Sequence, residues 1–598
     1  MLGAQTLIGG SLGLITLLGI GSGLARRLSP LPLRFRLAVS VVTGAAVVDL
    51  LVMLILAFGG GVRALRYFAL TSVVVGCIEM FRSREYLTGS WSLTVTHPNR
   101  WFTAVIIAAL ALNFVIAIAP STKLDELRYH MLVPKRVLED DGLQLYRQPI
   151  ESAIFPQMTY QLGLSAADAA GFPESGNVIS WGIGAVLILF VIGVTTELTQ
   201  SSTAGSIAGA VAVVGLYTAV WHVTSGAHAL GDLATLTACL LVVLPRQRFD
   251  GLKPEVRLGF ICLASCVAAS TKISILPLGM ALTGIGIYRI AVQVGWSRAI
   301  ALALVVWGTV YGPAVVWTDV QSGSPFGLAT AKLFHSHFFG ANTLAQIGFA
   351  NQIGLVSFLR GLPPWISVGM LAALAAIAVA SIRREWQFRI LLGLVVGQAV
   401  LIALLLPHDF RFLGGLQFAA LVLGAQVLLT PPRGTFLMRH WCILLLTTCL
   451  PWLVLQAYYA RPFVESALGM VSRDEFIRKY VPFTDDFHAL DRILPPQAVL
   501  YVVNSRLPSY YAPRPVVYSL DDLRARGPLY RFSVGGTLPS DGRLLCTETL
   551  YENPRAIVFA FRTPGQPPIR DLLRVQRCSL SPVTEVRDYL SPAPQFRH

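Results

Sequence analysis

The chain has 598 residues, of which 54% are hydrophobic and only 13% are charged. A soluble globular protein carries about 25% charged residues, so this composition excludes an ordinary soluble fold. The net charge of +15 does not indicate nucleic-acid binding. The basic residues recur in short loops between apolar runs, without a reading motif, as is typical of the cytoplasmic loops of membrane proteins.

Apolar runs near the length that spans a bilayer, about 20 residues, follow one another along most of the chain. We count about 14 candidate spans and predict an all-α polytopic membrane protein. No hydrophilic leader with a small-residue cleavage site precedes the first run, so we expect that run to be retained. The candidate spans are 3–25, 38–58, 66–82, 101–119, 176–198, 203–222, 228–245, 256–271, 273–290, 299–317, 363–381, 389–406, 412–430 and 441–459.

Two loops between these spans are too long to be simple turns. With the basic loops in the cytoplasm, the loops 120–175 and 318–362 and both termini lie on the outer side. The first loop has apolar residues at helical spacing among prolines, which predicts short amphipathic helices in the membrane interface. The second carries His335 and His337 among phenylalanines. We expect it likewise to form short interfacial helices that cover a site at the membrane surface as a lid, with these histidines beside that site, or else to be a disordered linker.

From about residue 461 the composition changes, because charged residues become frequent and no spanning run follows. We therefore predict extra N-terminal helices in 1–100, a transmembrane core in 101–460 and a soluble extracytoplasmic α/β or α+β domain in 461–598. The strand-like segments of that domain are 498–503, 516–519 and 556–561, and its helix-like segments include 474–480 and 487–493.

Two cysteines lie in the predicted external domain. Cys546 and Cys578 are candidates for a disulfide, because an oxidising compartment favours such bonds. Near the other end of the chain, small residues alternate in the run 19–23. Inside a spanning segment this pattern predicts close helix packing rather than a phosphate loop.

A short charged stretch, Asp125-Glu126-Leu127-Arg128-Tyr129-His130, lies a few residues after the apolar run 101–119. So many titratable side chains cannot lie in hydrocarbon. At the membrane boundary a carboxylate could act on a lipid-borne substrate. In one interpretation Asp125 or Glu126 is a general base, ionised and within hydrogen-bond reach of the proton that it takes. In the other, the two acids only favour a helix N-terminus through its dipole, with Ser121 nearby as a cap.

Three further charged positions lie at or near the outer ends of spans. Asp232 either faces a water-filled cavity or caps its helix. Lys272, between two apolar stretches, either binds a phosphate or snorkels to the interface. Arg411, in the outer turn that also holds His408, pairs bidentately with phosphate or only with Asp409. Four external histidines show no known ligand spacing, so they do not predict a metal site; they are His222, His228, His335 and His337.

Short motifs occur in a fixed order between about residues 100 and 520. They are Asp125-x-Leu127-x-Tyr129-His130, Phe155-Pro156-Gln157, Gly323-Ser324-Pro325, Leu494-Pro495-Pro496 and Arg514-Pro515-Val516-Val517-Tyr518. This order resembles the C-type glycosyltransferase superfamily (GT-C), and most closely the bacterial relatives of glycosyltransferase family 39, the protein O-mannosyltransferase-like group that includes aminoarabinose transferases. The third motif departs from the group's Gly-Asn-Pro-like element at its middle residue, and the first three spans are additional to the usual core.

The resemblance implies a hexosyl- or pentosyltransferase of a bacterial inner membrane, with its catalytic face and C-terminal domain outside. A sugar would pass, with inversion, from a polyprenyl-phosphate carrier to a glycan, lipid or protein acceptor. Membrane lipids would be further partners, and nucleic acid would not. No cofactor is required, although some relatives use a divalent cation.

The same resemblance implies roles for single residues. Asp125 would take the proton of the acceptor, with Glu126 next in line, and Asp232 would orient the acceptor or the sugar. Lys272 and Arg411 would neutralise the donor phosphate. The other substrate-binding candidates are Arg128, Tyr129, His130 and His408.

Other classes of protein explain less of the sequence. A transporter or flippase of lipid-linked saccharides would explain the intramembrane charges, but it predicts related repeats in the two halves, and we find none. An O-antigen polymerase or ligase is expected to carry its catalytic residues in a large late loop, whereas the acid-rich loop here is early. A purely structural subunit gives no reason for Lys272 and Asp232. We therefore favour the glycosyltransferase.

Overall fold

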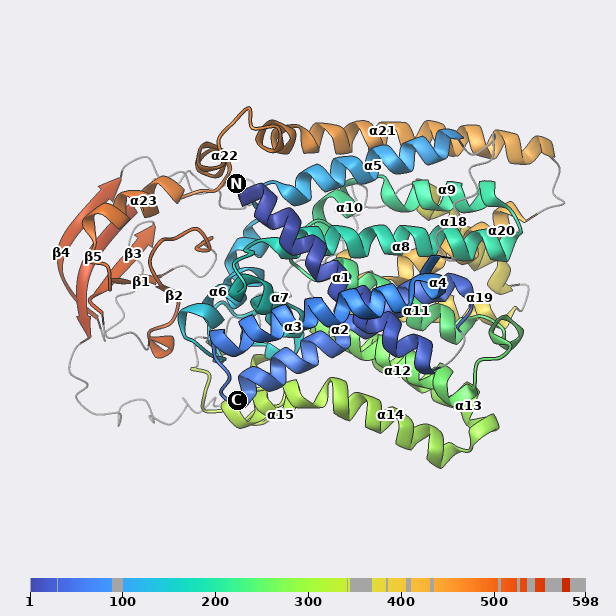
Figure 1. Cartoon of the computed structure of the whole chain (residues 1–598), viewed down its shortest axis with the longest axis horizontal. Coiled ribbons are helices and arrows are strands. Elements are labelled where there is room, and N and C mark those ends of the chain that lie inside the picture. Colours follow the sequence, from blue (N-terminus) through green and yellow to red (C-terminus); the bar gives the residue numbers. More distant parts are fainter. Residues whose placement is uncertain are drawn as a thin grey trace, which may run out of the picture. The chain divides into compact units, whose positions relative to one another are not determined.

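The chain divides into two compact units, and each is described by itself. The first unit contains Met1–Leu145 and Ile150–Ile477, and the second contains Tyr146–Pro149 and Arg478–His598. Figure 1 shows the helices of the first unit and the sheet of the second. The computed structural model describes residues 2–28, 31–88, 100–340, 343–344, 368–382, 385–404, 410–430, 435–503, 507–523, 527–534, 544–553 and 573–580.

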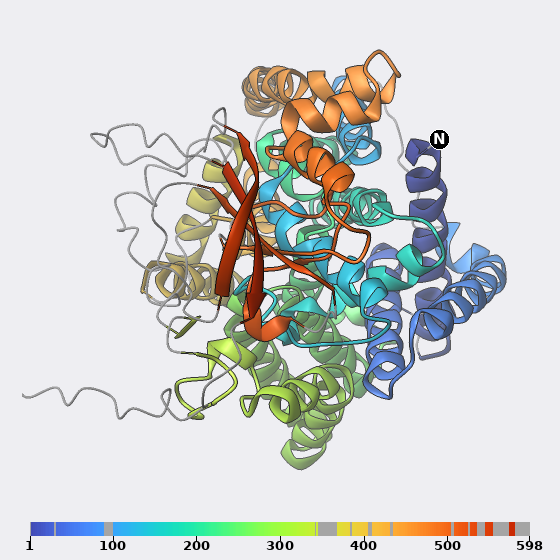
Figure 2. The ribbon, with the colours of Figure 1, turned by 90° about the vertical axis from the view of Figure 1, so that its left-hand side faces the viewer.

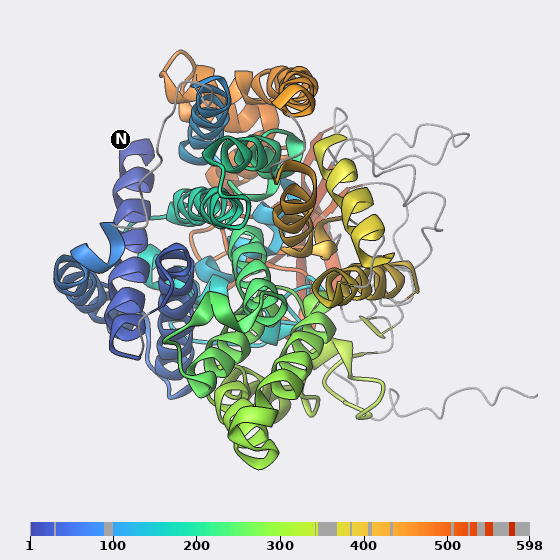
Figure 3. The ribbon, with the colours of Figure 1, turned by 90° about the vertical axis from the view of Figure 1, so that its right-hand side faces the viewer.

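The first unit is helical, and many of its long helices run in a common direction, as the end-on view of Figure 3 shows. Within the described part of the chain, seven helices are long and apolar enough to cross a membrane, or up to eight if a bent pair is one span. These seven are α1 (Leu2–Leu28), α2 (Leu33–Ala57), α3 (Val62–Arg82), α5 (Arg100–Ile118), α8 (Ser175–Thr199), α13 (Leu276–Val294) and α19 (Trp386–Leu404). A number of spans near 14 stays a prediction.

Other helices of this unit are shorter or fall outside that test. The shorter apolar helices are α9 (Ser202–Val213), α11 (His228–Val243), α18 (Val368–Ile382) and α20 (Leu416–Leu429). The remaining ones are α4 (Arg84–Thr88), α10 (Leu216–Trp221), η4 (Arg246–Phe249), α12 (Pro254–Thr271), α14 (Trp296–Val310), α15 (Gly312–Ser322), α21 (Thr435–Ala467) and α22 (Arg473–Tyr480).

Two of the expected spans are broken in the structure. The range 203–222 forms α9 and α10, because the backbone turns at Gly215 with φ 121°, a conformation that L-residues rarely adopt. The range 299–317 falls in α14 and α15, which are bent by 57°. Pro313, in the first turn of α15, lacks the N–H that would continue the ladder of α14.

The N-terminal helices pack closely through glycines. A methyl group on Gly21 of α1 would lie 1.7 Å from the carbonyl oxygen of Ser40 in α2, and one on Gly19 would lie 1.9 Å from that of Gly76 in α3. Gly10 of α1 lies against Val178 of α8 in the same way. The run 19–23 is therefore a packing surface, and α1 also packs on α8.

The loop after α5 folds into short helices, as its pattern predicts. These are η2 (Glu126–His130), α6 (Leu132–Glu139), η3 (Phe155–Met158) and α7 (Thr159–Ala169). In the described part of the loop after α15, η6 (Gly327–Ala329) is a short helix and residues 343–344 are helical, whereas residues 345–362 lie outside the described residues. Its Leu328 N–H donates to the carbonyl oxygen of Ala153 at 3.0 Å, so the two loops pack together.

The second unit contains a five-stranded sheet in the order β2-β1-β3-β5-β4, drawn in red in Figure 2. Strand β1 is parallel to β2 and β3, whereas β5 is antiparallel to both β3 and β4. Helix α23 covers the sheet, with the ring of Phe487 stacked 5.0 Å from that of Phe532. The elements are α23 (Thr484–Ile493), β1 (Val499–Val502), β2 (Val516–Val517), η8 (Leu520–Asp522), β3 (Leu529–Val534), β4 (Leu544–Asn553) and β5 (Leu573–Leu580).

The expected strands 498–503 and 516–519 coincide with β1 and β2, and the expected strand 556–561 lies outside the described residues. Cys546 of β4 and Cys578 of β5 are register partners and form a disulfide, with their α-carbons 4.1 Å apart. The unit begins at Arg478 rather than near residue 461, because α21 continues through Pro462 to Ala467.

A short segment of the first long loop, Tyr146–Pro149, belongs to the second unit. The carboxylate of Asp522 accepts the backbone N–H groups of Arg147 and Gln148 at 3.0 and 3.2 Å and also pairs with the Arg147 guanidinium at 3.4 Å. The Asp522 side chain is 1% exposed. One buried carboxylate therefore holds the segment.

We predict that Asp522→Ala releases this segment. Two buried N–H groups would lose their acceptor, at a cost of about 1–3 kcal/mol each. Hydrogen exchange of a peptide covering 143–152, measured by mass spectrometry on the intact protein, should become at least about tenfold faster. Asp485→Ala is the matched control, because the Arg478–Asp485 pair is largely exposed and contributes little. Equal exchange in both variants would contradict the assignment.

Candidate functional site

The site is built on a break in the helical backbone at Lys272. Helix α12 ends at Thr271, Lys272 is extended with φ −154° and ψ 129°, and α13 begins only after the short turn η5 (Ile273–Ile275). Pro277 in the first turn of α13 prevents one continuous helix. Gln157 accepts the N–H of Ile273 at 3.1 Å, and Gln398 donates to the carbonyl of Ser274 at 3.1 Å. Side chains thus satisfy backbone groups that the break frees.

The Lys272 side chain is buried against the charged stretch after α5. Its Nζ lies 3.3 Å from the Tyr129 hydroxyl and 3.4 Å from Nε2 of His130. Nδ1 of His130 lies 2.8 Å from Nε2 of the Gln161 amide, which also donates to the Ser225 carbonyl at 3.4 Å. Lys272 therefore extends to Tyr129 and His130 and does not snorkel to the membrane interface.

Asp125 and Arg411 meet across this cluster. The Arg411 guanidinium lies 3.0 Å from Oδ2 of Asp125 and 4.6 Å from the centre of the Trp221 ring. Arg411 lies in η7 (Phe410–Leu413), where Gln398 also donates to the Phe412 carbonyl at 2.8 Å. One glutamine therefore ties the backbone that carries Arg411 to the backbone that follows Lys272.

Several cations act on the Asp125 carboxyl, which is 30% exposed. Burial alone would raise its pKa, but the charges of Arg411, Arg128 and Lys272 outweigh that effect and lower it. Burial and the same three cations lower the pKa of His130, so the imidazole is neutral. Burial raises the pKa of Tyr129, which keeps its hydroxyl protonated. Among the described residues, the cluster thus combines the carboxylate of Asp125 with neutral donors and three cations, one of which pairs with Glu151.

Arg128 faces a different acid. It pairs closely with Glu151, and Gln157 donates to the backbone carbonyl of Glu151 at 2.9 Å. Gln157 therefore links the partner of Arg128 to the break at Lys272. The same side chain belongs to the Phe-Pro-Gln motif seen in the sequence.

The second acid of the stretch points elsewhere. Glu126 is 3% exposed, accepts from the Ser121 hydroxyl and accepts the N–H of Ser225 at 2.8 Å. Asp125 makes no side-chain capping bond at the start of η2, whereas Glu126 lies in the first turn of η2, where the helix dipole favours an acid. Asp125 and Glu126 are therefore in different surroundings, although they are adjacent in the chain.

Asp232 belongs to a separate buried cluster. Its Oδ2 accepts from the Tyr217 hydroxyl at 2.9 Å and lies 2.8 Å from Nε2 of His222. Helix α11 begins at His228 with Ala227 before it, so Asp232 lies in the second turn and does not cap the helix. The neighbouring backbone is close, because a methyl group on Gly415 would lie 2.1 Å from the Asp232 carbonyl oxygen.

The structure therefore brings together six of the predicted site residues and separates the others. Glu126 and Asp232 lie in neighbouring clusters, His335 and His337 are exposed, and His408 with Asp409 lies outside the described residues. No group of three or more potential metal ligands occurs among the described residues. The residues brought together are Asp125, Arg128, Tyr129, His130, Lys272 and Arg411.

Four side chains of the site were missed as functional residues, namely Gln157, Gln161, Trp221 and Gln398. The spacing of Gln157 and Gln161, four residues apart at the start of a helix, places them on one face and could have marked the pair. Gln398, a lone amide in an apolar run, carries a weaker signal. Nothing in the sequence around Trp221 indicates its contact with Arg411.

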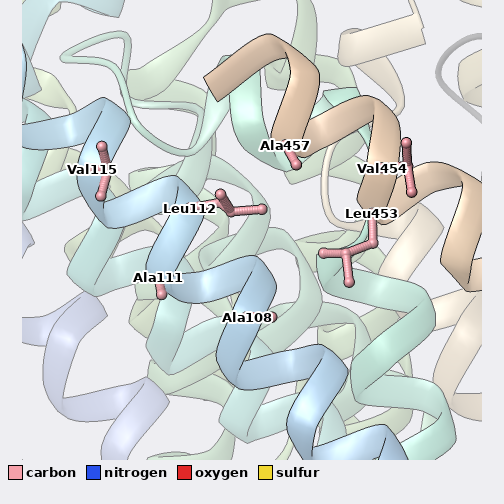
Figure 4. Close-up of a pocket in the computed structure, with 7 residues that line it drawn as sticks. All are labelled: Ala108, Ala111, Leu112, Val115, Leu453, Val454 and Ala457. Atoms are coloured by element: carbon pink, nitrogen blue, oxygen red, sulfur yellow. The ribbon is translucent and has the colours of Figure 1, made fainter. Parts of the chain in front are cut away.

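An open apolar groove of about 460 Å³ lies between α5 and α21 (Figure 4). Its walls carry no polar side chain, so it suits hydrocarbon and offers no chemistry. Its lining residues are Ala108, Ala111, Leu112, Val115, Leu453, Val454 and Ala457.

Comparison of the chain with protein-family models, curated proteins and solved structures gives no match. The function must therefore be argued from the site itself.

We predict that Arg411→Gln raises the pKa of Asp125. The variant removes the charge that most strongly opposes the effect of burial, so the carboxyl should bind its proton at a higher pH than in the unaltered protein. The pH dependence of the carboxylic C=O infrared band would measure this, with Asp125→Asn assigning the band.

Arg248→Gln is the control for that measurement. Arg248 pairs with Glu197 at 3.8 Å, and both side chains are more than a third exposed. This change should leave the pH at which the Asp125 band titrates unchanged. A band that titrates at the same or a lower pH in Arg411→Gln would contradict the assignment.

Proposed function

We propose that the chain is an integral-membrane glycosyltransferase that moves a sugar from a polyprenyl-phosphate donor to an acceptor at the outer face of a bacterial inner membrane. The observation that carries the proposal is the meeting of Asp125 with Arg411 and Lys272 at a backbone break between apolar helices. The proposal includes about 14 spans, an extracytoplasmic C-terminal α/β domain, and a glycan, lipid or protein acceptor.

The chemistry requires one base and a place for one phosphate. The acceptor hydroxyl attacks the anomeric carbon, the bond from that carbon to the phosphate oxygen breaks, and Asp125 takes the hydroxyl proton. The carrier phosphate leaves with its negative charge, which Lys272 and Arg411 stabilise. The sugar is inverted, and no redox or metal step is needed.

The ion pair between Asp125 and Arg411 gives this reaction an order of events. A phosphate that binds Arg411 competes with Asp125 for the same guanidinium, which suits bidentate pairing with phosphate. As the pair loosens, the carboxylate loses its strongest opposing charge and its pKa rises. Donor binding would therefore make Asp125 a stronger base when the base is needed.

The remaining residues of the cluster hold the donor head group. Tyr129 and neutral His130 contact Lys272 and so fix the direction of its ammonium group. Arg128 adds positive charge from the side of Glu151. We assign Asp232 to the support of the α10–α11 turn rather than to direct contact with the sugar, because Tyr217 and His222 both bind its Oδ2.

We predict that Asp125→Asn lowers kcat by a factor of about 10² or more while the protein stays folded, because the amide keeps the shape and cannot accept the proton. Mass spectrometry of lipid extracts with and without the gene would first identify the polyprenyl-phosphate sugar that accumulates. Turnover of that donor is then measured in reconstituted vesicles.

Glu139→Gln is the matched control, since Glu139 lies in the same loop and pairs with Lys135 at 3.7 Å, outside the cluster around Lys272. It should retain the turnover of the unaltered protein. Full turnover by Asp125→Asn would refute the assignment of the base. Movement of the intact donor across the vesicle membrane without sugar transfer would instead favour a flippase.

A further inference from the structure

The carboxylate of Glu126 is too enclosed to receive an acceptor hydroxyl. Its Oε2 accepts from the Ser121 hydroxyl, its Oε1 accepts the N–H of Ser225 at 2.8 Å, and the residue is 3% exposed. A general base needs an open lone pair within reach of the proton that it takes. The surroundings of Glu126 therefore suit a structural role.

Lys123 lies in the segment just before η2 and contacts the same part of the chain as Glu126. Its Nζ donates to the carbonyl of Val220 and lies 6.0 Å from the centre of the Tyr459 ring. Burial lowers the pKa of Lys123 to about 7, and the charge of Glu126 opposes that shift. Burial likewise raises the pKa of Glu126, and the charge of Lys123 opposes that shift. Together the two side chains bind the chain at residues 220 and 225.

The residues between Val220 and Ser225 lie against the clusters around Arg411 and Asp232. Trp221 lies under the Arg411 guanidinium at 4.6 Å, and His222 lies 2.8 Å from Asp232. The Ser225 hydroxyl donates to Asn177 at 2.7 Å, and a methyl group on Gly226 would lie 3.2 Å from Nε2 of His130. The turn therefore fits closely against the cluster, with little room to move.

We propose that Glu126 and Lys123 are positioning residues, which clamp the turn 220–225 so that Trp221 holds Arg411 beside Asp125 and in place for the donor phosphate. The clamp acts on donor binding through Trp221 and Arg411, and neither residue touches the reacting atoms. This inference rests on the proposed function for its role, although the clamp itself is independent of it.

The test separates positioning from proton transfer by comparing KM with kcat. In Glu126→Gln and in Lys123→Met, KM for the polyprenyl-phosphate sugar should rise about tenfold, which is about 1.4 kcal/mol, with kcat within about threefold. The double variant should cost no more than either single one, because both act on one turn. Glu139→Gln should leave both constants unchanged.

Hydrogen exchange provides a readout that needs no substrate. Peptides covering 216–230 should exchange faster in Glu126→Gln, since the Ser225 amide loses its carboxyl acceptor, and should stay unchanged in Glu139→Gln. If the unaltered protein transfers no sugar, the proposed function fails while this measurement still decides the clamp. Ser121→Ala, which removes one donor to Glu126, should show the same effect more weakly and replaces Glu126→Gln if that variant does not fold.

Two results would overturn the inference. A fall of about 10² or more in kcat with unchanged KM in Glu126→Gln would make Glu126 an acid or base of the reaction. Unchanged exchange in 216–230 in the folded variants would show that the pair does not hold the turn.

Discussion

The site depends on a backbone that stops being helical within an apolar bundle. Backbone N–H and C=O groups freed by such a break need partners, because hydrocarbon offers none. Glutamine side chains supply them: Gln157 accepts from Ile273, and Gln398 donates to Ser274. A third one, Gln456, accepts the N–H of Gly215 at the break between α9 and α10. These amides fix where the chain bends, and the bends place Lys272 and Trp221.

The concentration of positive charge is the second constraint. Arg128, Lys272 and Arg411 all act on Asp125, and charges held at an apolar boundary are costly unless they are compensated. Asp125 and Glu151 provide part of that compensation. A phosphate group would provide more, in a place where the cations already converge. This convergence of cations is what supports the proposed phosphate donor.

The sequence predicted the parts of the site that are local. The break at Lys272 follows from its polar neighbours between apolar runs, and the short helices after α5 follow from their spacing and prolines. It could not predict the contact of Asp125 with Arg411, 286 residues away, because neither hydrophobic period nor charge pattern specifies a partner. The sequence also did not predict the broken helices at Gly215 and Pro313, since a continuous apolar run has the same composition whether or not it bends.

The different roles of two adjacent acids follow from geometry rather than from residue type. Asp125 stands at the start of a single π-helical turn, closed by the Met131 N–H on the Glu126 carbonyl at 2.9 Å. Successive side chains of a helical turn point in different directions, so neighbouring carboxylates enter different surroundings. The Asp125 carboxylate lies beside guanidinium groups and is partly exposed. The Glu126 carboxylate accepts from a hydroxyl and an amide and is buried. Environments of this kind separate the tasks of paired carboxylates in enzymes, and here the path of the chain around η2 decides which of the two acids stays partly exposed.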